Sequence, residues 1–534
     1  MKAHQPPLII LSGAYCSADI AAEFGELPPS FLPVCGQRLY QRQIKLAQGS
    51  AVFLSVPSDY ILSHSDVDFL QKNNMRVLRV PRQLSLVTSM QLVLEMAAIA
   101  GPVKILFGDT LIDGEEACPD DSFATQTSLG YYRWSYCEVE NDRISFTEGM
   151  GDGQTKRDIL VGYFVFSDAE CLRQSLIGSQ NLPEALGQYH RSKKLTQVTI
   201  KNWYDFGHLN LFFQSIKNLA VSRAFNHITS DGMMVTKSSE QSHKMKSEIL
   251  WYRYLPDAFK LYTPRFMGEI QAEEPGYRLE YLYFPLVSEL YAFGTLPKQR
   301  WRKILASCFD FLSLCHATKP RAGAVEANEE FSALYFKNVL ADKTRHRLRD
   351  YAAQAALDLH QPLRRTGGRD VSLQQVCDDV LRAIPPTTPA DICLSHGDFF
   401  FGNIFYDVRA ERVQVIDPRG FMEAGPPTFY GDARYDLAKL AHSVIGQYDR
   451  ILAGRCTMVD GVIDLQDEDI HPDMEKDFWA EVQRRTPYHP RDILAMTVTL
   501  FLSMLPLHKE DQPRQQLLLA NALRLYEKMQ GMPA

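Results

Sequence analysis

The chain has 534 residues, of which 45% are hydrophobic and 23% charged, and its formal net charge is −7. This length exceeds what one hydrophobic core supports, so we expect two or three domains of ordinary globular composition. The negative charge offers no electrostatic footprint for nucleic acid or for an anionic membrane surface. No apolar run reaches the 18 residues of a membrane span, so none is expected.

The ten cysteines are scattered along the chain without a C-x-x-C pair. This pattern favours a reducing compartment over a disulfide or zinc framework. The opening residues MKAHQPPLIILSG have an apolar run too short for a signal peptide. We therefore expect a cytoplasmic protein, while the oligomeric state stays open.

Residues 1–220 alternate strand-like and helix-like segments, which predicts a doubly wound, Rossmann-like α/β sheet. An apolar strand from Leu8 to Leu11 runs directly into Ser12 and Gly13. Further motif-bearing segments are LPPSFLPVCGQRLYQRQIKLA (27–47), VKILFGDTLIDG (103–114), LVGYFVFSD (160–168) and KNWYDFGHLNLFFQSIK (201–217).

In this order, the segments resemble the sugar-phosphate nucleotidyltransferases. The resemblance implies that Ser12 and Gly13 belong to a nucleotide-binding loop. It also implies that Asp109 and Asp205 bind the Mg²⁺ that accompanies the nucleotide phosphates. His208 is then a candidate substrate contact.

The nucleotide loop of this domain departs from the family pattern. Residues 13–19 contain no basic side chain, and Pro29 stands where the family has a lysine. Each missing cation removes a charge-assisted contact worth roughly 1.5–3 kcal/mol. Three interpretations remain: a nucleotidyltransferase that contacts phosphate through Arg38 or Arg42, a domain that binds a nucleotide-sugar without reacting it, or a scaffold. Binding or scaffolding is favoured.

Residues 221–534 begin with a strand candidate, Met233 to Val235, that ends at Lys237. Residues 244–252 have apolar positions at helical spacing. A strand over Leu279–Phe284 is expected before Pro285 and a further helix. Other expectations are weak phosphate contacts from Ser222, Arg223 and Asn226, and an exposed polar insertion over 341–372.

The most informative stretch is LSHGDFFFGNIFYDVRAERVQVIDPRG, residues 394–420. It carries His396 and Asp398, then Asn403, then Asp417 after the apolar run VQVI. Transfer of a phosphoryl group needs a carboxylate facing the acceptor hydroxyl, and an amide oxygen and a second carboxylate for Mg²⁺. The spacing from Asp398 to Asn403 is that of a kinase catalytic loop. Ordinary turns could explain each residue singly, but the ordered set favours function.

This variant, with Gly397 in place of the usual arginine, resembles the aminoglycoside phosphotransferase and choline kinase-like family. The resemblance implies an α+β, bilobal, protein-kinase-like domain over 221–534. Its N-lobe would span about 221–285 and its C-lobe about 286–534. Either ATP or GTP would be the phosphoryl donor.

The same resemblance assigns a role to each candidate site residue. Asp398 is the catalytic base, and Asn403 and Asp417 hold Mg²⁺. Lys237 and Glu248 form the ion pair that positions the phosphates. The other residues assigned are His396, which belongs to the nucleotide site and braces the loop, and Asp436, which caps its helix or braces the loop.

We therefore expect a nucleotide-dependent phosphotransferase that acts on a hydroxyl of a sugar, polyol or amino alcohol. By analogy of domain pairing, it would serve surface or capsular polysaccharide synthesis in bacteria, with an N-terminal domain that binds a nucleotide or nucleotide-sugar. One alternative is a bifunctional enzyme that makes a nucleotide-activated building block. Another is a non-catalytic nucleotide-sensing or assembly protein. Antibiotic resistance is a weaker alternative, because aminoglycosides are polycations that call for an acidic groove.

Overall fold

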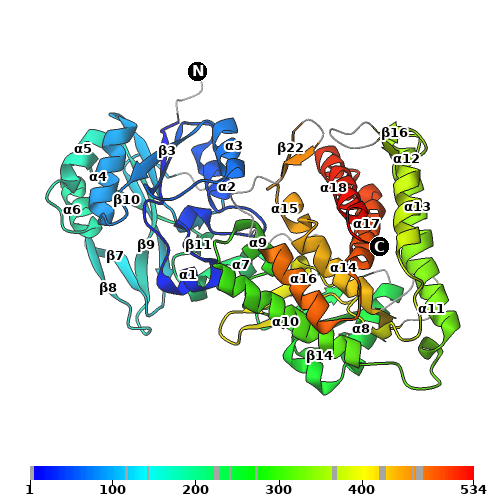
Figure 1. Cartoon of the computed structure of the whole chain (residues 1–534). Coiled ribbons are helices and arrows are strands. Elements are labelled where there is room, and N and C mark those ends of the chain that lie inside the picture. The colour runs from blue at the N-terminus through cyan, green and yellow to red at the C-terminus, as the bar shows by residue number, and fades with distance from the viewer. Residues whose placement is uncertain are drawn as a thin grey trace. The chain divides into compact units, whose positions relative to one another are not determined.

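A computed structural model describes residues 5–114, 118–140, 143–221, 228–239, 242–270, 275–363, 370–419, 428–459, 462–464 and 473–533. The chain divides into two compact units (Figure 1). The first comprises Met1–Leu219 and Phe293–Thr295, and the second comprises Ala220–Ala292 and Leu296–Ala534. Three predicted phosphate contacts lie outside the described residues: Ser222, Arg223 and Asn226.

The first unit is built on one large mixed sheet. Its strands are β1 (Leu8–Leu11), β2 (Val52–Pro57), β3 (Met75–Val80), β4 (Val103–Phe107), β6 (Ser122–Ser128), β7 (Arg133–Glu140), β8 (Arg143–Met150), β9 (Arg157–Phe166) and β10 (Thr196–Thr199). The order is β10-β6-β9-β4-β1-β2-β3, and β7 joins β8 to β9. Strands β3, β2, β1 and β4 run parallel, whereas β9 is antiparallel to both β4 and β6.

Helices and a short ribbon complete this unit. They are α1 (Ala18–Phe24), α2 (Tyr40–Gln43), α3 (His64–Lys72), α4 (Leu86–Ala97), α5 (Ala169–Leu176), α6 (Leu182–Ser192) and α7 (Leu209–Val221), with the ribbon β5 (Thr110–Ile112) and β11 (Trp203–Asp205). Helices α4, α5 and α6 lie beside the sheet (Figure 1), and their side chains share a core with it. Strand β2 is buried throughout and β1 nearly so, as expected of parallel strands covered on both faces.

The parallel pairing of β1 with β4 positions the predicted motifs of this unit. Leu11 pairs with Phe107, and the amide of Gly108 donates to the carbonyl of Leu11 at 2.8 Å. The loops that follow both strands therefore leave the same edge of the sheet, where ligands bind in open α/β sheets. Ser12 and Asp109 belong to these two loops.

The second unit begins with a four-stranded antiparallel sheet and becomes mostly helical. The sheet has the order β12-β13-β15-β14, from strands β12 (Ile228–Ser230), β13 (Met234–Ser238), β14 (Phe266–Ile270) and β15 (Gly276–Glu280). The helices are α8 (Ser242–Tyr254), α9 (Val287–Phe293), α10 (Lys298–Ala317), α11 (Glu329–Tyr335), α12 (Lys343–Ala355), α13 (Leu373–Ala383), α14 (Ala433–Val444), α15 (Tyr448–Leu452), α16 (Met474–Arg485), α17 (Pro490–Met504) and α18 (Gln512–Gln530). A π-helical segment, Phe336–Asp342, joins α11 to α12.

Two-residue to four-residue strands pair between these helices. They form the ribbons β16 (Pro362–Leu363) with β17 (Val371–Ser372), β18 (Ile392–Leu394) with β21 (Tyr430–Asp432), β19 (Ile404–Asp407) with β20 (Arg412–Val415), and β22 (Thr457–Val459) with β23 (Val462–Asp464). The apolar run VQVI before Asp417 is therefore the last three residues of strand β20 and the residue after it.

Helix α17 lies at the centre of the helical part, against α12, α13, α14 and α18 (Figure 1). Together with the turn that follows, residues Pro490–His508 are long and apolar enough to cross a membrane by length and composition. However, 72% of this segment is buried inside the protein, as in a core helix.

Two expectations for this unit were wrong. The strand expected over Leu279–Phe284 covers Gly276–Glu280 instead, because the antiparallel register with β13 ends there. The polar stretch 341–372, expected to be an exposed insertion, contains helix α12, which buries Leu348 and Tyr351. The apolar positions of this helix lie on one face. The polar average composition of the stretch therefore gives no sign that one face packs against the protein.

Candidate functional site

The loop that follows β18 is held in place by one carboxylate of helix α14. Asp436 accepts hydrogen bonds from the Ser395 hydroxyl at 2.9 Å and from the amides of His396 and Gly397 at 2.7 and 2.8 Å. Burial raises the pKa of Asp436 to about 6, against the lowering effect of these three donors. Asp432, not Asp436, caps the helix, so Asp436 braces the loop.

Gly397 occupies a position that a larger residue could not share. Its φ is +75°, and a Cβ placed there would lie 2.2 Å from the carbonyl oxygen of Arg419. The amide of Arg419 in turn donates to the carbonyl of His396 at 2.6 Å. The close approach of these two backbone segments explains why glycine replaces the arginine of the usual kinase loop.

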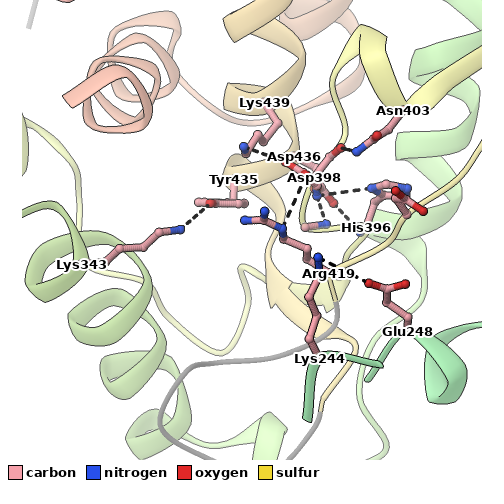
Figure 2. Close-up of polar contacts among 12 residues, drawn as sticks. Lys244, Glu248, Lys343, His396, Asp398, Asn403, Arg419, Tyr435, Asp436 and Lys439 are labelled. Atoms are coloured by element: carbon pink, nitrogen blue, oxygen red, sulfur yellow. Dashed lines mark hydrogen bonds and ion pairs between the residues drawn. The ribbon is translucent and has the colours of Figure 1, made fainter. Parts of the chain in front are cut away.

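Asp398 lies between two cations that sequence reasoning missed. Its carboxylate is 2.8 Å from Lys439 Nζ and 3.6 Å from Arg419 Nε, as Figure 2 shows. Burial would raise the pKa of Asp398, but the charges of Lys439 and Arg419 hold it well below its ordinary range. The side chain is still 14% exposed, so an ionised carboxylate is accessible to a small molecule.

The positions of these cations explain why they were missed. Lys439 follows Asp436 by three residues on α14, which places both on one helix face. Arg419 comes two residues after Asp417. A rule based on the spacing of acidic residues cannot identify either cation. The helical spacing from Asp436 could nevertheless have pointed to Lys439.

Asn403 and Asp417 lie at neighbouring ends of the β19–β20 ribbon. The amide of Ile416 donates to the carbonyl of Asn403 at 3.0 Å. Asn403 uses its side-chain nitrogen to donate to the carbonyl of Asp398, which leaves its amide oxygen for another ligand. Asp417 adopts a φ of +56°, and its side chain is 40% exposed. A carboxylate and an amide oxygen are the hard oxygen donors that Mg²⁺ prefers, so this pair fits the ion.

Lys237 on β13 contacts two carboxylates. Its Nζ is 2.8 Å from Glu248 on α8 and 2.9 Å from Asp417. Burial alone would lower the pKa of Lys237, but Asp417 and Glu248 raise it above the usual value, so the lysine stays charged. Glu248 is 1% exposed and also accepts from the Tyr277 hydroxyl at 2.8 Å. Lys244 is more distant from Glu248, at 3.9 Å.

His396 is completely buried beneath the loop. Its Nδ1 accepts from the amide of Asp398 at 3.3 Å, and burial lowers its pKa to about 4. Next to it, the indole of Trp251 on α8 donates to the carbonyl of Ser395 at 3.0 Å. A neutral, buried histidine supports the loop, and this geometry favours bracing over direct contact with a nucleotide.

In the first unit, the structure brings Asp109 and Asp205 together. Asp205 pairs with Thr110 across the β5–β11 ribbon, and burial and the charge of Asp205 raise the pKa of Asp109. His208 Nδ1 lies 3.1 Å from Asp205, which raises the pKa of His208 although burial opposes this. Among the described residues, no group of three or more His, Cys, Asp or Glu side chains could hold a metal ion.

The nucleotide loop of the first unit is tied to the fold. Ser12 is 1% exposed, and its hydroxyl accepts from the amide of Ser30 at 3.0 Å. A Cβ on Gly13 would lie 2.3 Å from a methyl group of Val80, so glycine is required by the packing.

The suggestion that Arg38 or Arg42 contacts phosphate is not supported by their surroundings. Both are 4% exposed. Arg38 donates to the carbonyl of Phe31, and Arg42 donates to that of Val34. Both guanidinium groups therefore bind the protein's own backbone.

Comparison with known proteins gives one family match and several similar solved structures. Residues 222–465 match the model of the phosphotransferase enzyme family, APH. No curated protein sequence matches the chain significantly. An aminoglycoside-3'-phosphotransferase of type VIII is 15% identical, with a TM-score of 0.33 over 51% of this chain and 84% of its own.

Two further solved structures are similar to different parts. Glucosamine kinase is 13% identical, with a TM-score of 0.35 over 56% of this chain and 76% of its own. The nucleoside-diphosphate-sugar pyrophosphorylase from Vibrio cholerae RC9 is 13% identical, with a TM-score of 0.32 over 39% of this chain and 99% of its own. The family match covers residues 222–465, the stretch that contains Lys237, Asp398 and Asp417.

Proposed function

We propose that the second unit transfers the γ-phosphoryl group of ATP or GTP to a hydroxyl of a small polar molecule, in a bilobal kinase-like domain. One observation carries the proposal: an accessible, ionised Asp398 lies beside Asn403, in one unit with Asp417 and its partner Lys237. These are the parts that phosphoryl transfer requires.

The residues of the chain make a small direct contribution to the chemical step. The acceptor oxygen forms a bond to the γ-phosphorus, and the bond from that phosphorus to the oxygen bridging to the β-phosphate breaks. The hydroxyl proton passes to Asp398 and then to solvent. Because its low pKa makes Asp398 a weak base, its main contribution is to orient the hydroxyl through a hydrogen bond.

Other residues position the donor. Lys237, held by Glu248, would contact the phosphates, and Asn403 and Asp417 would hold Mg²⁺, which neutralises phosphate charge when bound. Arg419 and Lys439 keep Asp398 ionised and lie where negative charge develops during transfer.

We also propose a biosynthetic role and a cellular location for the protein. The pairing with a nucleotidyltransferase-like unit supports synthesis of a surface polysaccharide precursor, with a nucleotide or nucleotide-sugar bound by the first unit. No disulfide joins the ten cysteines among the described residues, which supports a cytoplasmic location.

A second candidate is a bifunctional kinase and nucleotidyltransferase. The adjacency of Asp109 and Asp205 favours it, because two neighbouring carboxylates suit a metal-bound nucleotide. Turnover of CTP, UTP or GTP with a sugar phosphate, lost on Asp109→Asn, would establish this activity.

The kinase proposal is tested by ADP release from the full chain over sugars, polyols, amino alcohols and aminoglycosides. We expect transfer to at least one acceptor, and a loss of roughly 10²–10⁴-fold in Asp398→Asn. Nucleotide affinity, measured by calorimetry, should change by less than a few-fold. Silence on every acceptor with intact nucleotide binding would instead support a nucleotide-sensing protein.

A further inference from the structure

A small cavity opens beside the loop that carries Asp398. Its volume is about 60 Å³, and its lining includes Asn338 of the π-helical segment, Lys343 at the start of α12, Gly397, Arg419 and Tyr435 of α14. A water needs about 10–15 Å³ of such space, so about four waters, or a group of four or five heavy atoms, would fit. The mechanism above leaves Lys343 and Asn338 without a role.

The described lining of the cavity carries two cations, Lys343 and Arg419, and no carboxylate. Lys343 Nζ lies 3.4 Å from the hydroxyl of Tyr435, and Figure 2 shows it approaching Tyr435 from the side away from Asp398. In the described part of the chain, the groups that act on Lys343 are Tyr435 and the cations Lys439, Arg347 and Arg419. Arg419 and Lys439 both contact Asp398. The lining itself holds two cations, Lys343 and Arg419, and Arg419 shares its charge with Asp398 outside the lining.

The remaining charged groups that the structure describes nearby do not restore the balance. Asp436 is occupied by the backbone of the loop, and its burial disfavours ionisation. Glu326 reaches only Thr428, at 3.4 Å. Arg347, on α12, adds to the positive potential at Lys343.

Titration of the neighbouring groups agrees with this geometry. Burial and the surrounding cations lower the pKa of Lys343. Burial would raise the pKa of Tyr435, yet Lys343, Lys439 and Arg419 lower it below the ordinary value for a phenol. Both shifts indicate a positive potential in a partly desolvated space.

Resting on the kinase activity proposed above, we propose that the cavity holds an anionic substituent of the acceptor, a phosphate or a carboxylate. Lys343 and Arg419 would supply the charge, and the Tyr435 hydroxyl and the Asn338 amide would supply further hydrogen bonds. The acceptor is then a hydroxy compound with a negative charge. A polycationic aminoglycoside would place its charge against Lys343 and Arg419.

Arg419 and Lys439 also compensate the transferred phosphoryl group, so Lys343 gives the selective test. We expect the full chain to prefer the charged member of at least one matched pair by about 10-fold or more: glucosamine and glucosamine 6-phosphate, glycerol and glycerol 3-phosphate, or glucose and glucuronate. The first two pairs probe phosphate, and the third probes carboxylate. Higher salt should weaken the preference.

Lys343→Met should lower kcat/KM for the anionic acceptor by about 10- to 100-fold, the effect of one hydrogen bond to a charged group. The loss should arise in KM, with kcat and nucleotide affinity little changed and neutral acceptors unaffected. Lys343→Arg should recover part of the loss. Lys337→Met, an exposed lysine on the same helical run, should match the wild type.

Preference for neutral or cationic acceptors, or an equal effect of Lys343→Met on both members of a pair, would overturn the inference and leave the kinase activity standing. If no acceptor reacts although ATP binds, the kinase proposal fails. The anion-binding role of the cavity is then tested by ligand binding alone. Glucose 6-phosphate and glucuronate would then be titrated calorimetrically in the presence of Mg²⁺ and ADP. Binding that Lys343→Met abolishes supports the anion site, and absence of binding by both refutes it.

Discussion

The two pairs of carboxylates in this chain differ in how their negative charge is balanced. In the second unit, Asp398 contacts Lys439 and Arg419, and Asp417 contacts Lys237. In the first unit, the charged partner that the described part of the chain offers to the Asp109–Asp205 pair is His208. Two neighbouring acids therefore do not by themselves make a phosphate site, because the polyanion also needs cations.

The sharpest way to break this comparison is to neutralise one acid in each unit. Asp417→Asn should lower phosphoryl transfer by at least about 10²-fold, because a metal ion supplies several kcal/mol of charge stabilisation. Asp109→Asn should leave transfer to the acceptor unchanged. Both variants would be assayed for ADP release across a magnesium titration. A comparable loss in Asp109→Asn would show that the first unit contributes to the kinase reaction.

The buried ion pair can be broken from its lysine side. Lys237→Met should destabilise the second unit by about 3 kcal/mol, because Glu248 stays buried without its nearest cation. It should also weaken nucleotide binding. Urea unfolding and calorimetry measure these effects. Lys246→Met, an exposed lysine on the neighbouring helix, is the matched control and should be near neutral. Equal effects of the two substitutions would contradict the role assigned to Lys237.

The glycine of the loop offers a test of backbone strain. Gly397→Ala should cost about 1–3 kcal/mol and reduce transfer, because the left-handed φ and the Arg419 carbonyl both oppose a methyl group. Gly454→Ala is the matched control, with a φ of +67° and open space around its Cβ position. The difference between their urea midpoints isolates the clash. Similar midpoints would mean that the loop shifts freely.

The smallest effect expected is a change in pH dependence. Lys439→Met removes the nearest cation, so the pKa of Asp398 should rise and the acid limb of kcat should move to higher pH. The folded-state pKa of Asp398 lies below its unfolded value, so its ionised form stabilises the wild type above about pH 4, and this contribution is lost as the pH falls. Profiles of kcat and of thermal unfolding against pH measure both. An unmoved acid limb would exclude Asp398 as the titrating group.

The sequence was most informative where spacing and periodicity determine the structure. The helical spacing over 244–252 predicts α8, and the structure brings Glu248 of this helix to Lys237. The apolar strand before Ser12 is β1. Asp436 was assigned to capping or bracing, and the structure selects bracing.

The remaining features depend on tertiary contacts that no spacing rule contains. Arg38 and Arg42 look like available cations in a sequence, but packing turns them onto backbone carbonyls. Lys439 and Arg419 gain their importance only because α14 and the segment after Asp417 converge on Asp398. Helix α12 was hidden by its charged surface, and with it the position of Lys343.

The indole of Trp251 has a consequence for control of the enzyme. Through its bond to Ser395, it fastens the helix bearing Glu248 to the strand end that leads to Asp398. Swinging that helix outward, a common way to switch kinases off, would leave a buried carbonyl unsatisfied, at a cost of about 1–3 kcal/mol. A single hydrogen bond therefore couples the helix that carries Glu248 to the strand that leads to Asp398, and any outward movement of that helix must break it.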